Sequence, residues 1–503
     1  MKPLQKIVIL GGGTTGWMCA AMLANSVNTK RINIELVESE QIGTIGVGES
    51  TVPPFMDMLA SLGIDEVEFI QATQATFKLG IQFKDWLKKG ETFFHPFGRA
   101  EAGMDELSLY HLWLRAQLSG DTFSRFLDYS PNSVMAQLKR FAPYKAVPGT
   151  LLADSRYALH LDAGLVAKYL RNFAQQKGVK RKEGKVEKVN ISADAAPRIL
   201  SLQLESGQTI SGDFFIDCSG FRALLIGDAL QSSFTDWSTY LPCNRAVTVQ
   251  SEPLPELPPY TKATAQLAGW QWRIPLQHRT GNGYVYASKY ISDEQATQTL
   301  LSNVQGKTLT EPRIIPFTTG MRKQVWKANC IGVGLAAGFI EPLESTAIHL
   351  AMRGIAEFLQ QFPHSDCNLA LINEYNARLQ QDYEEIRDFI ILHYAATERN
   401  DSDFWAYCKN VEWPASLVQT VEYFKARGDV PRKLAPLFES TSWRSLCEGM
   451  NIRPSAYSAF IENVDYKASK QHMQNYKQQL VSLVNQIPSH KAFIEQNCAS
   501  SSK

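Results

Sequence analysis

The spacing of apolar residues changes along the chain from short runs to long helical repeats. Near the N-terminus an apolar run at 6–10 precedes a helical segment at 17–25, and a second apolar run follows at 32–37. Two buried parallel strands joined by a helix give this order of elements. The pattern therefore predicts a βαβ unit at the start of the chain.

The middle of the chain mixes strands and helices, whereas the end is helical. We expect a helix at 165–176, strands at 199–204, 214–216, 270–275 and 284–290, and a loop at 252–260, where four of nine residues are proline. From Thr346 onward the apolar residues follow a helical period, over 348–362 and again over 372–390. The predicted fold class is α/β with a mainly helical C-terminal part.

Charge and composition exclude several classes of protein. Among 503 residues, 51 Lys and Arg balance 50 Asp and Glu, which gives no electrostatic basis for binding nucleic acid or an anionic membrane. We find no apolar run of the ~18 residues that a membrane-spanning helix needs, and the run at 7–10 is too short for a signal peptide. The eight cysteines form no CxxC pair, which indicates reduced thiols and a cytoplasmic protein. The nine histidines include no HExxH motif, so we expect no metal site.

The first strand leads into a glycine-rich turn, Gly11-Gly12-Gly13-Thr14-Thr15-Gly16. It contains GxGxxG between a strand and a helix, which is the context that a dinucleotide-binding motif requires. Gly11 makes the tight turn, Gly13 lets the backbone approach a pyrophosphate, and Gly16 lets the helix pack closely on the strand. Glu38 ends the second strand, where an acid accepts hydrogen bonds from ribose hydroxyls. We therefore predict a dinucleotide site.

Three further elements favour FAD over NAD as the dinucleotide. They are a second glycine-rich strap, Gly46-Val47-Gly48-Glu49-Ser50-Thr51, an Asp217-Cys218-Ser219-Gly220 string after a strand, and a glycine-rich segment at 332–338. The last is not expected to be a second nucleotide motif, because a helix follows it instead of a strand with a terminal acid. Reduced flavin must then come from another protein.

Together these elements resemble the flavin-dependent tryptophan halogenases over about residues 5–450. The resemblance rests on the nucleotide motifs and on three more strings, Phe77-Lys78-Leu79-Gly80-Ile81, Trp270-Gln271-Trp272-Arg273-Ile274-Pro275 and Pro342-Leu343-Glu344-Ser345-Thr346. The W-x-W-x-I-P string is the discriminating one, because ordinary flavin hydroxylases share the nucleotide motifs without it.

The resemblance implies a Rossmann-like FAD-binding fold of the flavin monooxygenase type. Residues 1–362 would form the FAD-binding α/β body, with substrate-facing insertions at about 96–156 and 236–283, and residues 363–503 would form a helical part that completes the substrate pocket. It also implies a two-component reaction, in which a separate NAD(P)H-dependent flavin reductase supplies FADH2. Oxygen and halide, chloride or bromide, then give hypohalous acid, which crosses a tunnel to a lysine and halogenates an indole or another electron-rich aromatic. A homodimer is a further expectation from the family.

Two residues match the family's catalytic pair. Lys78 would position or capture the halogen, and Glu344 would accept the proton lost from the ring carbon or polarise the halogenating species. The residues alone leave other interpretations open. Lys78 alternates with Phe77 and Leu79 on a predicted strand, which is typical of a solvent-facing lysine, and Glu344 precedes a helix, where the helix dipole favours an acid.

The remaining site residues are carried over from the family in the same way. Halide would bind at Thr346 and Ala347, Trp270 and Trp272 would shield the flavin side from organic substrate, and His95, Phe97 and Trp443 would line the substrate. The cofactor-binding set would be Gly11, Gly13, Thr14, Thr15, Gly16, Glu38, Gly48, Glu49, Ser50, Val186, Leu335 and Ile348. Ser345 and Thr346 are expected to cap a helix whose free N–H groups form an anion site. Taken singly, either tryptophan, or the His95 and Phe97 pair, is also typical of core packing.

The sequence departs from tryptophan-specific members in two places. Ala347 replaces the glycine that usually follows the halide threonine, and Trp443 and Arg444 replace a pair of tyrosines near the amino-acid end of the substrate. Lys433 or a nearby neutral residue lies where an acid would meet the substrate ammonium, and a cation there would repel it. Free tryptophan is therefore expected to be a poor substrate, and we expect instead an indole without the amino-acid group, another electron-rich arene, or a larger peptide or carrier-bound substrate. Two other functions stay open, an FAD-dependent aromatic hydroxylase and a catalytically silent flavin-binding protein.

Overall fold

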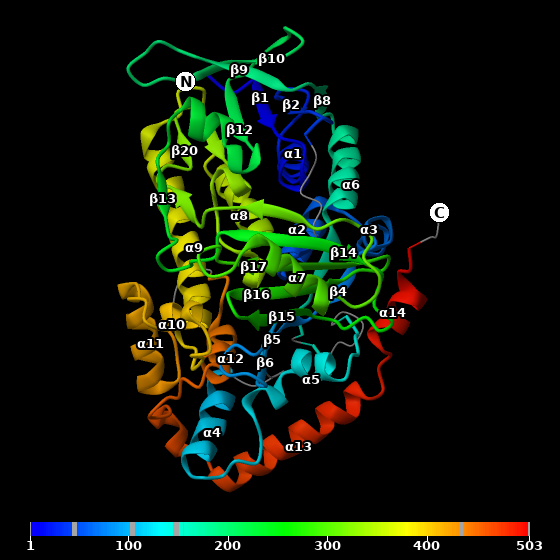
Figure 1. The fold of residues 1–503 in the computed structure, drawn as a ribbon, viewed down its shortest axis with the longest axis vertical. Helices are drawn as coiled ribbons and strands as arrows, with labels where there is room; N and C mark the ends of the chain where they lie inside the picture. The colour runs from blue at the N-terminus through cyan, green and yellow to red at the C-terminus, as the bar shows by residue number, and fades with distance from the viewer. Residues whose placement is uncertain are drawn as a thin grey trace.

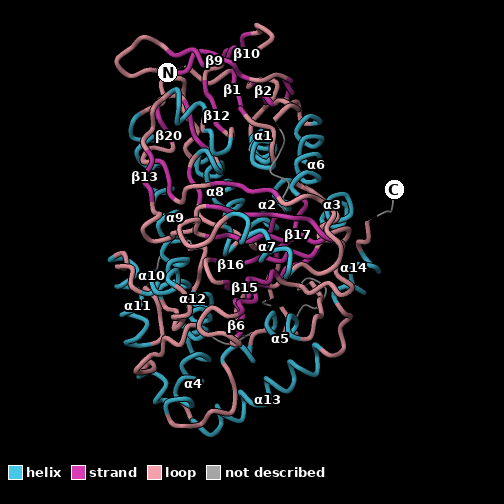
Figure 2. Tube along the Cα trace, viewed as in Figure 1, coloured by secondary structure: helices cyan, strands magenta, loops and turns pink. Residues whose placement is uncertain are grey.

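The computed structural model describes residues 2–42, 48–100, 106–143, 150–153, 155–431 and 436–500. Its elements form three regions along the long axis of the molecule (Figure 1). A parallel sheet with its helices lies at the N-terminal end, a larger mixed sheet lies in the middle, and helices gather at the opposite end (Figure 2). Within the described residues, we find no helix that is long and apolar enough to cross a membrane.

The N-terminal region is built on a six-stranded sheet in the order β20-β21-β12-β1-β2-β8. All neighbouring pairs are parallel except β20 with β21. The strands are β1 (Lys6–Leu10), β2 (Asn33–Glu38), β8 (Lys180–Glu183), β12 (Phe214–Asp217), β20 (Trp326–Lys327) and β21 (Cys330–Gly332). Helix α1 (Thr14–Ser26) follows β1 and packs between α6 (Ala163–Gln176) and α8 (Ala347–Gln360). The predicted βαβ unit is confirmed, and its helix begins three residues earlier than expected.

The middle region is built on a seven-stranded sheet in the order β18-β14-β17-β16-β15-β5-β6, in which only β15 and β5 run parallel. Its strands are β5 (Gly80–Lys84), β6 (Thr92–Pro96), β14 (Arg245–Ser251), β15 (Thr261–Gln266), β16 (Gly269–Pro275), β17 (Thr280–Tyr286) and β18 (Arg313–Pro316). The strand predicted at 284–290 is wrong in its bounds, because Ala287 turns away to bond with Ala268 and Tyr290 closes a turn on Ala287.

Three small sheets complete the strands. They are β3 (Gly48–Ser50), β7 (Ala158–Asp162) and β4 (Thr76–Lys78); β9 (Val186–Ile191), β10 (Ile199–Leu204) and β11 (Thr209–Ser211); and β13 (Phe234–Asp236), β19 (Gly320–Arg322) and β22 (Gly338–Phe339). In the first of these sheets β7 lies between β3 and β4, so it joins the glycine-rich strap to the strand that carries Lys78.

The remaining helices lie on both sides of residue 346 in the chain. Before residue 346 they are α2 (Pro54–Leu62), α3 (Glu66–Thr73), α4 (Glu106–Leu118), α5 (Pro131–Gln137) and α7 (Asp293–Asn303), with short turns η1 (Phe126–Tyr129), η3 (Gly220–Arg222), η4 (Leu224–Ala229), η5 (Gly334–Ala336) and η6 (Pro342–Glu344). After α8 come α9 (Leu369–Ala395), α10 (Asp403–Lys409), α11 (Ala415–Arg427), α12 (Ser440–Gly449), η7 (Ala459–Asn463), α13 (Tyr466–Val484) and α14 (His490–Asn497). The 27-residue α9 runs from the parallel sheet to the helical end (Figure 1).

The strand predicted around Lys78 is divided in two, and this decides the lysine's environment. Leu79 separates β4 from β5, and its backbone N–H bonds to Pro259 instead of to a ladder partner. The simple alternation of a single strand is therefore lost. Phe77 and Lys78 are both buried, so the solvent-facing interpretation of Lys78 is wrong.

Candidate functional site

The glycine-rich turn after β1 has the close contacts that its motif predicts. Gly11 has φ +119°, and a Cβ on it would lie 2.2 Å from the carbonyl oxygen of Cys218. A Cβ on Gly16 would lie 1.8 Å from the Gly11 carbonyl oxygen, which is how the helix packs so closely on the strand. Gly13 is the N-cap of α1 and Thr14 is its first residue, so the helix N-terminus opens at this turn.

Glu38 lies at the end of β2, as predicted, and already has protein partners. Its carboxylate accepts hydrogen bonds from Trp17 Nε1 (3.3 Å) and Arg181 Nε (2.5 Å), and it lies over Gly12, where a Cβ would overlap it. The Gly184 backbone N–H bonds to the Glu38 carbonyl, which brings the start of β9 and Val186 to the same edge of the sheet. Arg181 is a contact that the motif does not reveal.

The second glycine-rich strap lies against the middle sheet. Gly46 and Val47 lie outside the described residues, while Gly48, Glu49 and Ser50 form β3. Gly48 faces Gly281 so closely that a Cβ on Gly281 would lie 2.9 Å from the Gly48 Cα. Burial, together with the nearby charge of Asp162, raises the pKa of the Glu49 carboxyl to about 7.

The segment at 332–338 packs against the glycine-rich turn after β1. Gly332 ends β21 beside β12 in the parallel sheet, and Gly334 has φ +63° with Thr15 against it, where a Cβ would lie 2.9 Å from Thr15 Cγ2. Leu335 follows in η5 and is half-buried. The structure therefore places this segment against the start of α1.

Lys78 is fully buried at 0% exposure and joins two parts of the site. Its Nζ donates to the carbonyl of Thr51 (3.1 Å), directly after the strap, and to Ser345 Oγ (2.9 Å), directly before α8. The same Nζ lies 4.9 Å from the centre of the Phe97 ring. Burial lowers the pKa of the Lys78 ammonium to about 7, although the charge of Glu344 opposes this change. Lys78 therefore exists as both ammonium and amine near neutral pH.

Glu344 is buried at 1% exposure and is held by two histidines. His95 Nδ1 lies 2.9 and 3.1 Å from its two oxygens, and His393 Nε2 lies 3.0 Å from Oε1, close but not aligned as a hydrogen bond. Burial alone would raise the pKa of the Glu344 carboxyl, but the charges and hydrogen bonds of the two histidines outweigh burial and lower it to about 2. Glu344 is therefore a carboxylate across the physiological pH range.

The predicted tryptophan pair lies on β16, with ring centres 6.0 Å apart. Trp270 Nε1 donates to Glu341 Oε1 (3.2 Å), and the same oxygen accepts from the Tyr394 hydroxyl (2.5 Å). Burial raises the pKa of Glu341 to about 7, although both hydrogen bonds oppose this change. Trp272 lies over Gly283 on the neighbouring strand, where a Cβ would lie 2.1 Å from its ring.

The start of α8 carries an unsatisfied hydroxyl at the predicted halide position. Thr346 is the N-cap, but its side chain makes no capping hydrogen bond, and among the described residues its buried Oγ1 has no partner. Ser345 makes no such bond either; it lies in the left-handed region at φ +61° and receives the Lys78 hydrogen bond. Thr346 therefore occupies the predicted N-cap position without a capping hydrogen bond from its side chain, whereas Ser345 lies before the cap. Ala347 begins the helix as expected, and Ile348 follows it, buried.

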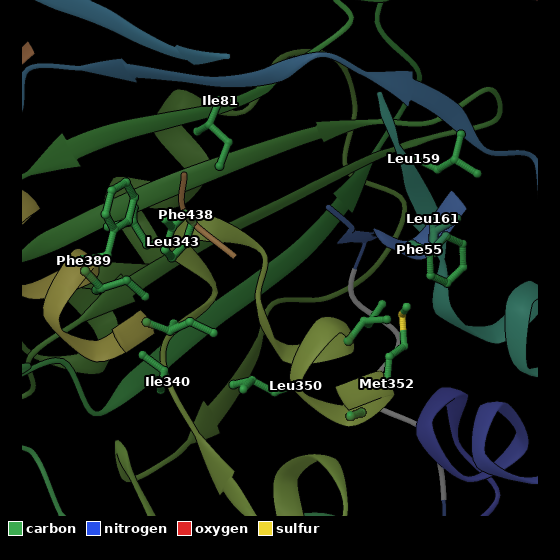
Figure 3. Packing of buried hydrophobic residues seen from close by; sticks show 14 of the residues in the cluster. Phe55, Ile81, Leu159, Leu161, Ile340, Leu343, Leu350, Met352, Phe389 and Phe438 are labelled. Carbon is green, nitrogen blue, oxygen red and sulfur yellow. The ribbon is translucent and has the colours of Figure 1, made fainter. Parts of the chain in front are cut away.

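Aromatic side chains form a wall beside Lys78 and Glu344. Phe389 stacks on Phe438 with ring centres 3.9 Å apart, as Figure 3 shows, and Trp443 meets Phe389 edge-on at 5.0 Å. The His95 ring lies 6.0 Å from Phe438 and 6.5 Å from Phe97. The three predicted substrate residues are thus brought into one aromatic cluster, and Phe389 and Phe438 extend it.

Arg444 does not lie in this wall, contrary to its predicted place beside the substrate. Its guanidinium donates to Asp429 Oδ1 (2.8 Å) and lies 4.5 Å from the centre of the Tyr110 ring. Because Trp443 and Arg444 are neighbours on α12, they leave the helix about 100° apart, and only one of them can face the wall. Lys433 lies outside the described residues.

Sequence reasoning missed His393 and Glu341. His393 follows Phe389 by four residues on α9, so it shares the inward face of that helix, and this spacing is the signal that could have found it. Glu341 stands three residues before Glu344, but the sequence around it gives no sign that its side chain meets Trp270.

Comparison with known proteins gives one consistent result. Residues 6–466 match the tryptophan halogenase family. The chain is 33% identical to the tryptophan 6-halogenase SttH of Streptomyces toxytricini, over 96% of this chain and 97% of that protein. Its structure matches Xcc4156, a flavin-dependent halogenase from Xanthomonas campestris, with a TM-score of 0.95 and 40% identity over all of both chains. It also matches BrvH, a flavin-dependent halogenase from Brevundimonas sp. BAL3, with a TM-score of 0.93 and 37% identity over 98% of this chain and 99% of that one.

The family match spans the glycine-rich turn with its close contacts, the strand of the buried Lys78 and the buried Glu344, and the match to SttH extends over 96% of the chain. The chain belongs to the tryptophan halogenase family of flavin-dependent halogenases.

Proposed function

We propose that this enzyme halogenates an indole or another electron-rich aromatic that lacks the amino-acid group of tryptophan, with Lys78 delivering the halogen and Glu344 taking the ring proton. The observation that carries the proposal is the pairing of a buried lysine amine with a buried, histidine-held carboxylate beside an aromatic wall. The body at 1–362 would bind the flavin, and the helices of 363–503 would complete the substrate pocket.

The nucleotide cleft fits FAD. The close backbone approaches at Gly11 and Gly16 leave no room for side chains, which suits a pyrophosphate at the start of α1. The adenosine and phosphate part of FAD would be held by Thr14, Thr15, Glu38 and Val186. The part of FAD that lies nearer α8 would be held by Gly48, Glu49, Ser50, Leu335 and Ile348. When bound and reduced, FAD supplies hypohalous acid from oxygen and halide.

The chain would receive its reduced flavin from a separate NAD(P)H-dependent reductase. The support is that the segment at 332–338 packs against the start of α1, beside the first glycine-rich turn. We place the enzyme in the cytoplasm, because all eight cysteines are free thiols. A homodimer is proposed from family membership.

Thr346 and Ala347 would hold the halide. The Thr346 hydroxyl is buried and unsatisfied within the described structure, and it stands at the N-terminus of α8, where backbone N–H groups and the helix dipole favour an anion. Trp270, fixed by Glu341, and Trp272, fixed over Gly283, would keep organic substrate away from the flavin.

Lys78 has two ways to handle hypohalous acid, and its pKa of about 7 allows both. As an ammonium it donates a hydrogen bond to the acid's oxygen, which makes the halogen more electrophilic. As an amine it attacks the halogen, so that an N–halogen bond forms and the oxygen–halogen bond breaks; the released hydroxide takes a proton from the nitrogen and leaves as water. The contacts with Thr51 and Ser345 hold the nitrogen in place in either form.

Glu344 would complete the substitution on the ring. When a ring carbon takes the halogen, that carbon must lose its proton to restore aromaticity. A carboxylate with a pKa of about 2 is a weak base, but a halogenated ring cation is a far stronger acid than any side chain, so a weak base suffices. His95 holds both carboxylate oxygens and so orients the carboxylate.

The aromatic wall favours a substrate without an ammonium group. Phe97, His95, Phe438 and Trp443 offer ring faces and edges, which suit a flat neutral arene. Glu344, the acid in this wall, is already compensated by two histidines and would gain little from a substrate ammonium. The relative SttH is a tryptophan 6-halogenase by name, so preference for indole over tryptophan would separate this chain from it.

The test is an assay with purified protein, FAD, a flavin reductase, NADH and air. Indole and tryptophan are supplied in parallel with bromide, chloride or neither, and mass spectrometry detects the halogen isotope pattern. We expect halide-dependent halogenated indole in excess of halogenated tryptophan. Strong turnover of tryptophan with weak turnover of indole would overturn the substrate proposal.

Two variants serve as the test and the control in this assay. Lys78→Ala is expected to abolish the halogenated product, whereas Lys84→Ala, which removes a half-buried lysine from the next strand, is expected to keep it. An oxygenated product that forms without halide would favour the hydroxylase alternative. Flavin binding without turnover on a broad panel of arenes would favour the silent flavin-binding protein.

A further inference from the structure

The strand that carries Lys78 is short and lies at the edge of its sheet. Strand β4 has three residues, and β7 is its one neighbour among the described strands. Buried backbone N–H groups on the outer side of such a strand need acceptors from elsewhere. The Leu79 N–H donates to the Pro259 carbonyl (2.7 Å). The Phe77 N–H donates to His490 Nε2 (3.1 Å). The backbone on both sides of the lysine is therefore held by segments that are distant in the sequence.

The two partners of His490 define how its ring is protonated. The Phe77 N–H only donates, so Nε2 carries no hydrogen. Nδ1 lies 2.8 Å from the Leu257 carbonyl oxygen, which only accepts, so Nδ1 carries the hydrogen. Both nitrogens of this fully buried ring thus have a partner. Burial also lowers the pKa of His490 to about 4, in agreement with a neutral ring.

His490 is the first residue of α14, and further contacts hold this end of the helix beside β4. The His490 N–H donates to the Lys139 carbonyl (2.9 Å). The Phe493 ring meets the Phe77 ring edge-on at 5.6 Å and the Phe141 ring at 5.1 Å. The rings of Phe77 and Phe141 stack with their centres 4.0 Å apart. The start of α14 thus contacts the residue before the lysine through a hydrogen bond and through ring packing.

The other end of α14 is joined to the residue that precedes β4. Gln277 Nε2 donates to the Ala75 carbonyl (2.8 Å) and to the Cys498 carbonyl (3.4 Å). The Ser500 N–H donates to Gln277 Oε1 (2.9 Å). One glutamine therefore connects the residues after α14 to the start of β4, and both elements lie on the same side of the molecule (Figure 1).

We propose that α14 fixes strand β4 at two points and that His490 is a positioning residue, which sets the place of Lys78 through the Phe77 N–H. This inference rests on the proposed role of Lys78 in delivering the halogen. It assigns a task in catalysis to a helix that lies outside residues 6–466, the part of the chain that matches the tryptophan halogenase family. The task needs no charge on His490, because the neutral ring supplies the acceptor.

The position of β4 matters because Lys78 Nζ reaches two separate elements. It donates to the Thr51 carbonyl (3.1 Å), which follows β3, and to Ser345 Oγ (2.9 Å), which precedes α8. A shift of β4 along the edge of its sheet would lengthen at least one of these hydrogen bonds. A displacement of about 1 Å at a catalytic group can lower a rate by about 10²-fold. We therefore expect His490 to affect kcat and not substrate binding.

The first experiment measures hydrogen–deuterium exchange in the full-length protein and needs no turnover. Peptides that contain the Phe77 amide are followed by mass spectrometry in wild type, His490→Gln and His490→Leu. Glutamine keeps an acceptor for the Phe77 N–H, whereas leucine has none. We expect this amide to exchange about tenfold faster or more in His490→Leu and to stay close to wild type in His490→Gln. Equal exchange in wild type and His490→Leu would overturn the proposal.

The matched control is His111→Leu. His111 is also fully buried, and its Nδ1 accepts a backbone N–H, that of Ser458 (3.2 Å), but it lies on α4 at the helical end (Figure 1). This variant should lose stability as His490→Leu does, while the exchange of the Phe77 amide and kcat stay unchanged. The same increase in exchange in both variants would indicate a general loosening of the fold and would contradict the proposal.

The second experiment compares kcat and KM for indole and bromide in the assay with flavin reductase. We expect His490→Leu to lose about 10- to 100-fold in kcat, with both KM values unchanged. His490→Gln should recover most of the lost rate, because it restores the acceptor. A wild-type kcat in His490→Leu, or an equal loss in His490→Gln, would refute the positioning role.

If His490→Leu fails to fold, Gln277→Ala tests the other end of α14. It removes the connection between Ala75 and the residues after the helix. It should raise the exchange of the Phe77 amide and lower kcat, and no change in either would overturn the proposal. If the wild type itself gives no halogenated product, the proposed function fails, while the exchange result still decides whether α14 holds β4.

Discussion

Replacing Lys78 by methionine should stabilise the fold at low pH, although it destroys the proposed active site. Methionine has a similar length and no charge, so it removes the cost of burying an ammonium. In the unfolded chain Lys78 has its ordinary pKa of 10.5, whereas in the fold the pKa is about 7. The unfolded chain therefore binds a proton that the folded chain lacks between these pH values, and wild-type stability rises with pH across that window.

The magnitude follows from the pKa difference. At about 1.4 kcal/mol for each pKa unit, the buried ammonium costs roughly 5 kcal/mol below pH 6 and about 1 kcal/mol at pH 10. Methionine loses the hydrogen bonds to Thr51 and Ser345, each worth about 1 kcal/mol. The variant should then be more stable than wild type by about 3 kcal/mol at pH 6 and less stable by about 1 kcal/mol at pH 10.

The assay is thermal unfolding of both proteins without flavin at pH 6, 8 and 10. In a chain of 503 residues, we expect the midpoint of Lys78→Met to lie about 3–5 °C above wild type at pH 6 and slightly below it at pH 10. Lys84→Met, at a half-buried position on β5, serves as the control for general effects of pH. A wild type that is more stable at pH 6, or a difference that does not change with pH, would refute the reasoning.

Three further changes test other parts of the site. Thr346→Val removes the unsatisfied hydroxyl and should raise the halide KM about tenfold with flavin affinity unchanged, as measured by steady-state kinetics and flavin titration. Glu341→Leu leaves the Trp270 and Tyr394 donors buried without an acceptor, so it should lower the free energy of unfolding by about 2–3 kcal/mol. It should also lower the fraction of oxidised flavin that yields product. Glu341→Gln keeps an acceptor, so both quantities should stay near their wild-type values. Arg444→Met breaks the buried pair with Asp429 and should cost about 3 kcal/mol in unfolding, while the ratio of indole to tryptophan turnover stays constant.

Each of these expectations has a clear contrary result. An unchanged halide KM in Thr346→Val would remove the hydroxyl from the halide site. If the same fraction of oxidised flavin yields product in Glu341→Leu and in Glu341→Gln, the hydrogen bond from Trp270 to Glu341 does not fix Trp270. A shift of Arg444→Met toward tryptophan would return that arginine to the substrate end of the pocket.

The local pattern of the chain was enough to predict the nucleotide half of the protein. The close contact of Gly11 is with Cys218 from a distant segment, whereas the glycine at Gly16 is required by a contact with Gly11 within one strand–turn–helix unit, and such a contact follows from spacing alone. The same holds for the acid at the end of β2 and for the start of α8 at Ala347. The resemblance to the halogenases then pointed to Lys78 and Glu344, which local spacing alone would have left as a surface lysine and a helix-start acid.

The tertiary structure alone decided what those side chains do, because their partners come from distant segments. Lys78 meets Ser345 across 267 positions, and Glu344 meets His95 across 249. Such pairings depend on how sheets and helices pack, and no residue period encodes them. Burial of Lys78, the approach of His393 to Glu344 and the place of Arg444 outside the aromatic wall are all consequences of that packing. The sequence by itself determined the fold class and the flavin motifs, because these are local. The protonation states and the contacts of Lys78 and Glu344 were decided only by the tertiary structure, because their partners come from distant segments.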